Sequence, residues 1–223
     1  MIGLILAENW FAPFTDIIPI VLEGFWVTLE VIIAGFFFGF IVGSIFGLGR
    51  LSNNKFIYGI SSVYVEVMRG TPILVQLLFI YYGLAAMIDV NFSALTAGIM
   101  AITVNAGAYI AEIVRGAVYS IEKGQSEAGR SIGLTKTQTM RYIIWPQAIK
   151  RMIPPLGNQF IISLKDTSLF SIIALHEIVY QGRQYITTTF VIAQPYITIA
   201  IAYLVITIPF SLLLRRVERR LDV

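Results

Sequence analysis

The sequence predicts an all-α integral membrane protein with five transmembrane helices, from its composition, its long uncharged runs and the placement of its charges. Of its 223 residues, 57% are hydrophobic and 13% are charged, whereas a soluble domain has about 45–50% apolar and about 25% charged residues. So few charged side chains cannot cover a water-facing surface, which argues against a soluble globular protein, a disordered chain and a coiled coil. The chain has no cysteine, which excludes disulfide scaffolds, zinc–thiolate sites and cysteine nucleophiles.

Long stretches without Asp, Glu, Lys or Arg define the predicted spans. A helix needs about 20 apolar residues to cross the hydrocarbon core of a bilayer, and most of the uncharged runs meet or nearly meet that length. The run that starts at Met152 is shorter, but it continues past Lys165 and Asp166 into another apolar stretch. No run shows the alternation of a transmembrane barrel. We predict one transmembrane domain, residues 1–223, with spans at about 20–50, 57–88, 92–118, 150–175 and 190–215.

The positive charges predict the orientation of the spans. Lys and Arg gather between spans one and two, between spans three and four, and after span five, whereas Arg183 alone lies between spans four and five. Cytoplasmic loops are enriched in Lys and Arg, so the N-terminus is predicted outside and the C-terminus in the cytoplasm. An odd number of spans agrees with this assignment. Because the basic residues are spread over three loops between spans, a nucleic-acid interface is not predicted.

The longest predicted cytoplasmic segment, at about residues 121–146, is polar and compatible with helix. Gly124 and Gly133 interrupt it, and Pro146 ends one helical stretch or starts the next. One interpretation is a basic amphipathic linker that lies on lipid headgroups. The other is a segment that docks on a partner protein, and composition alone leaves both open.

Four motifs in this sequence resemble those of bacterial ABC importer permeases. Glu127-Ala128-Gly129, Gly133, Ile143 and Pro146 match the EAA loop of that family, except that Gly129 replaces its second Ala and Trp145 replaces its Leu. Four motifs in order at compatible spacing are much more specific than one, and the resemblance covers about residues 20–220. The other three resemble signatures of the polar-amino-acid branch: EVMRGTPILVQ at 66–76, AYIAEIVRG at 108–116, and PPLGN at 154–158 followed by LKDTSL at 164–169.

The resemblance implies that the EAA loop forms a coupling helix that docks on a cytoplasmic ATPase subunit. In such a loop Gly133 permits close approach, Glu127 and Arg130 can pair with charges on the partner, and Leu134 can supply an apolar anchor. The chain has no G-x-x-x-x-G-K-[ST] sequence, so it cannot hold ATP phosphates by that route. ATP and Mg²⁺ would be bound by the separate ATPase, and we predict no catalytic residue and no cofactor in this chain. The predicted docking residues are Glu127, Ala128, Gly129, Arg130, Gly133 and Leu134.

Charged side chains at membrane depth are the first candidates for a substrate site. Lys165 lies ten residues beyond Pro155, which places it roughly 15 Å along a helix and near the middle of the bilayer. Lys165 and Asp166 point about 100° apart on a helix, so each needs its own partner or the helix breaks there. Thr167 and Ser168 follow and can stabilise exposed backbone groups. An Asp and a Lys would complement the ammonium and carboxylate of an amino acid, and the alternative is a buried ion pair between helices.

Polar residues of spans two and three complete the predicted substrate site. Asn105 lies near the centre of span three, where it either hydrogen-bonds a neighbouring helix or orients a substrate. Met68 and Gln76 lie on either side of Pro72, which removes a backbone donor and can open the helix locally. The predicted substrate-binding residues are Met68, Gln76, Asn105, Lys165, Asp166, Thr167 and Ser168.

Several other features have mainly structural interpretations. Glu66 and Arg69 are three residues apart and can pair on one helix face, and Glu112 with Arg115 repeats that spacing, either as a structural pair or as part of a cytoplasmic gate. Glycines at 35, 39, 43 and 47 form a stripe that permits close helix packing. The only histidine, His176, has no obvious cluster of ligands around it, so no metal site is predicted.

Together these features predict a permease subunit of an ATP-driven importer for polar amino acids, with basic or amide ones preferred, in the bacterial cytoplasmic membrane. Two such subunits, identical or homologous, would form the pathway, and an extracytoplasmic binding protein would deliver the substrate. One alternative is a secondary transporter that uses Lys165 and Asp166 for ion coupling. Another is a non-transporting scaffold or channel subunit. The EAA-like loop argues against both, because neither needs a helix that docks on an ATPase.

Overall fold

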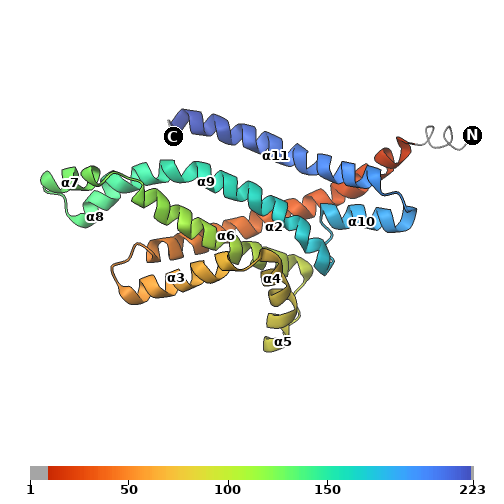
Figure 1. Cartoon of the computed structure of the whole chain (residues 1–223), viewed down its shortest axis with the longest axis horizontal. Helices are drawn as coiled ribbons and strands as arrows, with labels where there is room; N and C mark the ends of the chain where they lie inside the picture. Colours follow the sequence, from red (N-terminus) through yellow and green to blue (C-terminus); the bar gives the residue numbers. More distant parts are fainter. Residues whose placement is uncertain (1–9, 222–223) are drawn as a thin grey trace, which may run out of the picture. The chain divides into compact units, whose positions relative to one another are not determined.

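The computed structural model describes residues 10–221, and every regular element in that part of the chain is a helix (Figure 1). The predicted all-α class is therefore confirmed for the described residues. The four longest helices are α2 (Ala12–Gly49), α6 (Ala94–Tyr119), α9 (Trp145–Asp166) and α11 (Ala193–Leu221). The shorter helical segments are α3 (Lys55–Gly70), α4 (Ile73–Leu78), η1 (Phe79–Leu84), α5 (Ala85–Ile88), α7 (Lys123–Ser131), α8 (Lys136–Thr139), η2 (Met140–Ile144), η3 (Thr167–Ile173) and α10 (Ile178–Thr189).

Three of the described helices, α2, α6 and α11, are long and apolar enough to cross a membrane. The segment from α3 to α5 meets the same criteria when its two parts are taken together, so the described residues hold three or four candidate spans. Helix α9 is not among them, and it carries two charges near each end, Lys150 with Arg151 and Lys165 with Asp166. The five-span count and the orientation of the termini remain predictions.

The helices sort into two compact units. The first contains residues up to 35, 73–101 and 162–210, and the second contains 36–72, 102–161 and the residues from 211 onward. Helices α2, α6, α9 and α11 each contribute one part to each unit. Each unit is thus assembled from segments far apart in the sequence, so neither corresponds to a continuous stretch of chain.

In the first unit, α10 lies against the early parts of α2 and α11 (Figure 1). Ile17, Val21, Ile178 and Ile199 form the buried core of this contact. Gly182 brings α10 close to α11, because a Cβ at this position would lie 2.4 Å from the Cδ1 of Ile199. The short helix α10 is therefore held by its apolar face.

In the second unit, the glycines of α2 pack against α6. A Cβ at Gly43 would lie 2.6 Å from the carbonyl oxygen of Gly107, and one at Gly47 would lie 2.7 Å from the Cβ of Val114. A Cβ at Gly39 would lie 3.3 Å from the carbonyl oxygen of Thr103. The predicted packing role of the stripe is confirmed for these three glycines, since side chains there would push the helices apart.

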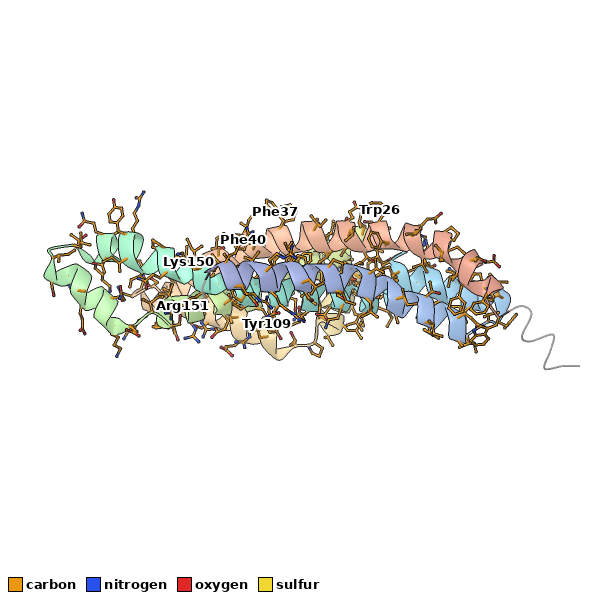
Figure 2. All side chains as sticks on the ribbon, turned by 90° about the horizontal axis from the view of Figure 1, so that it is seen from above. Trp26, Phe37, Phe40, Tyr109, Lys150 and Arg151 are labelled. Atoms are coloured by element: carbon orange, nitrogen blue, oxygen red, sulfur yellow. The ribbon has the colours of Figure 1, made fainter. Side chains whose placement is uncertain are left out.

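The opposite face of α2 is apolar and exposed. Phe37 and Phe40 point away from the helices that α2 packs against (Figure 2), and they are 61% and 45% exposed. Trp26, also on α2, is 68% exposed and points outward as well. Large apolar side chains on the outside of a protein are expected where the solvent is lipid.

Local sequence accounts for several helix ends. The Asn54 side chain accepts a hydrogen bond from the Phe56 N–H (2.9 Å) and so caps α3. Thr71 is extended (ψ 141°) at the other end of α3, because the following Pro72 disfavours helical geometry in the residue before it. Pro146 is the second residue of α9, but α8, η2 and α9 follow one another without a gap. Pro146 therefore neither ends nor starts the helical segment, and it lies where the π-helical η2 passes into α9.

Candidate functional site

The segment with the EAA-like motif folds as the nine-residue helix α7. Glu127, Ala128 and Arg130 are exposed on it, whereas Gly129 is buried. A Cβ at Gly129 would lie 2.7 Å from the Cδ1 of Ile143, so the Ala of the family motif would require the Ile143 side chain to shift. Helix α7 packs on α8 and η2 through this glycine, and its three exposed residues remain available for a partner.

Gly133 ends the turn that follows α7. It has a φ of +88°, a conformation that residues with a side chain rarely adopt. Its N–H donates to the carbonyl of Arg130 (3.0 Å), and the Leu134 N–H donates to the carbonyl of Gly129 (3.1 Å). A Cβ at Gly133 would meet no atom within 4 Å. Within the chain, Gly133 therefore allows the turn to adopt its left-handed backbone conformation. Its close approach to a partner remains a prediction.

A charged cluster joins α2, α3 and α6 in the second unit, and we define it as Arg50, Glu66, Arg69, Glu112 and Arg115. The Glu112 carboxylate is its centre: Arg50 Nη1 donates to Oε2 at 2.7 Å, Arg115 Nε donates to Oε1 at 3.0 Å, and Arg69 Nη1 lies 3.8 Å from Oε2. Arg50 Nη2 also lies 3.5 Å from Glu66 Oε1. One half-buried carboxylate thus contacts three arginines, one from α3, one from α6 and one from the turn after α2.

This cluster agrees only in part with the pairs predicted from sequence spacing. The Glu112–Arg115 pair is confirmed. Glu66 and Arg69 do not pair with each other in the structure; Glu66 contacts Arg50, and Arg69 contacts Glu112 and covers the ring of Tyr109 at 5.4 Å. Arg50 lies in the turn between α2 and α3, and its side chain is only 10% exposed. Spacing along one helix reveals neighbours on that helix, but these contacts depend on how three helices pack.

Lys165 and Asp166 lie at the point where α9 changes from an α-helix to the 3₁₀ segment η3. Lys165 is exposed and Asp166 is half-buried. Thr167 is fully buried, and its hydroxyl donates to the carbonyl of Leu164 (2.7 Å). The change of helix type occurs at the residue pair where a break was anticipated, and Thr167 supplies the backbone contact expected of it.

The other predicted substrate residues divide between the two units. Gln76 is buried on α4, which packs against η3 and so belongs with Thr167 and Ser168 in the first unit. Met68 and Asn105 belong to the second unit, on α3 and α6, which are joined by a hydrogen bond from the Tyr64 hydroxyl to the carbonyl of Val104 (2.8 Å). The predicted substrate residues are thus divided between the two units, and their role in binding a substrate remains a prediction.

Glu177 is a buried carboxylate that sequence reasoning did not single out. Its side chain accepts hydrogen bonds from the N–H groups of Val179 (2.8 Å) and Tyr180 (2.7 Å), which caps α10. The Tyr203 hydroxyl of α11 donates to it at 3.2 Å and also contacts the side chain of Thr167. Burial raises the pKa of Glu177 to about 7, although these hydrogen bonds and Arg183 act in the opposite direction. An acidic residue directly before an apolar helical stretch is the signal that could have identified it.

The long apolar helices and their exposed large apolar side chains define the class of protein: a helical membrane protein. The chain belongs to the family described as "Binding-protein-dependent transport system inner membrane component", whose model matches residues 35–223. The predicted resemblance to ABC importer permeases is confirmed, and an ion-coupled secondary transporter is not favoured.

Relatives of known sequence and structure agree with this assignment. The chain is 44% identical over 207 residues to the glutamine transport system permease protein GlnP of Escherichia coli (strain K12), covering 92% of this chain and 94% of the relative. It is 39% identical over 208 residues to the L-cystine transport system permease protein TcyB of Bacillus subtilis (strain 168), covering 92% and 87%. A crystal structure described as an amino acid ABC transporter with histidines superposes with a TM-score of 0.90 at 40% identity, covering 94% of this chain and 98% of that one.

Proposed function

We propose that this chain is the permease subunit of an ATP-driven importer for polar amino acids, with amide amino acids such as glutamine as the preferred substrates. The observation that carries the proposal is the exposed Glu127–Ala128–Arg130 surface of α7, on a chain whose relatives are amino acid permeases. The relative with 44% identity carries a glutamine transport name, which favours an amide over a basic substrate.

The proposed arrangement in the membrane has five spans, with the N-terminus outside and the C-terminus in the cytoplasm. Helix α9 together with η3 is the fourth span, and α7 lies on the cytoplasmic side, where Lys and Arg are most frequent. The bacterial cytoplasmic membrane is the proposed location. This assignment places Arg183 and the polar face of α10 outside, within reach of an extracytoplasmic binding protein.

The proposed mechanism is alternating access in a dimer of permease subunits. Two ATPase subunits bind ATP and Mg²⁺ and pull the two α7 helices together, which opens the pathway outward. Hydrolysis returns the pathway to the inward state. The permease residues bind and release the amino acid and break no bond themselves. Because a partner shifts the equilibrium between two states only by its difference in affinity for them, the ATP-bound ATPase must bind the outward state more tightly than the inward state.

Reconstitution tests this proposal. The permease, the ATPase encoded beside it and the cognate binding protein are placed in liposomes, and uptake of labelled glutamine, arginine and glutamate is measured. We expect ATP-dependent uptake that is fastest for glutamine, and loss of uptake with an ATPase that binds ATP but cannot hydrolyse it. Equal uptake with the inactive ATPase would contradict an ATP-driven importer.

Asp166 provides a test of the substrate site. If its carboxylate binds the substrate ammonium, Asp166→Asn should reduce uptake at least tenfold, because a charge-assisted hydrogen bond is worth about 1.5–3 kcal/mol. Assembly with the ATPase should be unchanged. The matched control is Asp89→Asn, an exposed residue outside the predicted site. Normal uptake by Asp166→Asn would return Lys165 and Asp166 to a structural role.

A further inference from the structure

A hollow of about 450 Å³ in the second unit is not used by the proposed transport mechanism. It is lined by Asn53, Lys136, Thr137, Met140, Arg141 and Trp145. Two of these residues are cations, two carry neutral hydrogen-bonding groups, and two are large and apolar. Its volume falls within the range of about 300–1,000 Å³ that is usual for small-molecule sites.

The two cations of this hollow have no anionic partner in the described part of the chain. The ion pairs found there involve the charged cluster around Glu112 and neither Lys136 nor Arg141. Arg141 contacts the ring of Tyr142, with its guanidinium carbon 5.9 Å from the ring centroid. Lys136 and Arg141 are both exposed to solvent and line the same hollow. Two like charges beside one hollow favour an anion there, and Arg and Lys are side chains that bind phosphate.

Exposed aromatic residues occur next to the hollow in the sequence. Phe56 follows Asn53 by three residues and is 75% exposed, Tyr142 follows Arg141 and is 64% exposed, and Trp145 is itself part of the lining. Trp and Tyr are enriched where a membrane protein crosses from hydrocarbon to headgroups. The lining combines donors from Asn53 and the two cations with the apolar surfaces of Met140 and Trp145, which matches a ligand that has a phosphate and an apolar chain.

We propose that this hollow binds the phosphate of an anionic phospholipid, such as phosphatidylglycerol, in the cytoplasmic leaflet. The proposal rests on the orientation given under Proposed function, which places Asn53 and α8 on the cytoplasmic side. Basic pockets at that face of membrane proteins recognise anionic headgroups. Helix α7 packs on α8 and η2, which supply most of the lining. A lipid seated there would thus lie beside the two helical segments on which α7 packs.

Lipid retention tests the proposal on the assembled importer. The complex is purified, delipidated and placed in phosphatidylcholine nanodiscs with increasing phosphatidylglycerol, and lipid that remains bound is counted by native mass spectrometry. We expect Lys136→Gln/Arg141→Gln to weaken retention of phosphatidylglycerol at least tenfold. The matched control is Lys150→Gln/Arg219→Gln, which removes one Lys and one Arg at exposed positions outside the hollow. Equal retention by the two double variants would overturn the proposal.

Two further measurements identify the ligand. Millimolar inorganic phosphate should not displace phosphatidylglycerol, because the acyl chains add apolar binding; displacement at that concentration would mean that the site takes a free anion. Retention of the ATPase subunit should be the same in both double variants. Loss of the ATPase only in Lys136→Gln/Arg141→Gln, with lipid retention unchanged, would assign the hollow to the partner protein instead.

Amino acid uptake by the wild-type complex separates this proposal from the proposed function. Uptake with ATP but without specific lipid retention would contradict the lipid site alone. Absence of ATP-dependent uptake in every lipid mixture would contradict the proposed function, whatever the lipid counts show.

Discussion

At the scale of single residues, the partners of a buried or half-buried carboxylate decide which of its protonation states the fold accommodates. Glu177 and Glu112 are both shielded from water, yet their surroundings differ. Glu177 receives two backbone N–H groups and a tyrosine hydroxyl, which are neutral donors. Glu112 receives three guanidinium groups. The first arrangement tolerates a protonated carboxyl, whereas the second requires an ionised one.

Glu177 should make the stability of the protein depend on pH. Its pKa is raised from 4.5 to about 7 in the folded protein, so between these values the unfolded chain loses a proton that the folded chain keeps. Stability contributed by this group is therefore present at low pH and decreases as pH rises through that window. At about 1.4 kcal/mol per pKa unit, the loss is on the order of 3 kcal/mol. Thermal unfolding of the purified protein at pH 5 and pH 7.5 should show it.

The comparison with Glu177→Gln isolates the effect. That variant cannot ionise, so its stability relative to wild type should improve from pH 5 to pH 7.5, even if it caps α10 less well at every pH. Glu23→Gln, which changes an exposed carboxylate on α2, should follow the wild type. A constant difference between wild type and Glu177→Gln over this range would contradict the assignment.

Glu112 should be essential for the stability of the second unit. Glu112→Gln leaves three arginines around a neutral amide, and Arg50 is largely buried. Removing one partner of a buried ion pair costs about 3–5 kcal/mol, and partial exposure of Glu112 should reduce this to about 2 kcal/mol. Thermal unfolding in detergent measures the loss.

The double variant Arg50→Met/Glu112→Gln should recover part of the lost stability, because it also removes the charge left without a partner. Equal unfolding temperatures for the double variant and Glu112→Gln alone would argue against the role of Arg50.

At the scale of elements, small residues decide how closely the helices pack. Gly43→Ala places a Cβ 2.6 Å from the carbonyl oxygen of Gly107, so α2 and α6 must separate. Overpacking of this kind costs about 1–3 kcal/mol, more than the 0.5–1 kcal/mol or so that Ala gains over Gly in a helix. The control is Gly116→Ala on α6, where a Cβ meets nothing within 4 Å. We expect a lower unfolding temperature for the first variant and an equal or higher one for the second.

The helices show how far sequence alone predicts the fold and the candidate site. Uncharged runs and proline positions predict α2, α6 and α11 and the break at Pro72, because these follow from hydropathy and backbone geometry. The glycine stripe predicts a packing face but not its partner helix. The contacts of Arg50 and Arg69 with Glu112 were missed, since they join residues that meet only after the helices pack. The hollow around Trp145 depends on the same packing. The cap formed by Glu177 is local and was also missed, although an acidic residue before a helical stretch signals it.

At the scale of the whole molecule, the proposed five-span topology requires α9 to be a span. Helix α9 carries charges near both ends and is not among the three or four candidate spans, yet the proposed orientation requires α9 with η3 to cross the membrane. Lys123, before α9, and Thr188, after η3, are both exposed. They should therefore lie on opposite sides of the membrane if α9 crosses and on the same side if it does not.

The absence of cysteine makes this test direct. Lys123→Cys and Thr188→Cys are introduced one at a time and treated in intact cells with a thiol reagent that cannot cross the membrane. Because the parent chain has no thiol, all labelling reports the introduced residue. We expect Thr188→Cys to react at once and Lys123→Cys to react only after permeabilisation, with Arg220→Cys behaving like Lys123→Cys. If Lys123→Cys and Thr188→Cys were labelled from the same side, α9 would lie outside the set of spans, and Lys165 and Asp166 could not be at membrane depth.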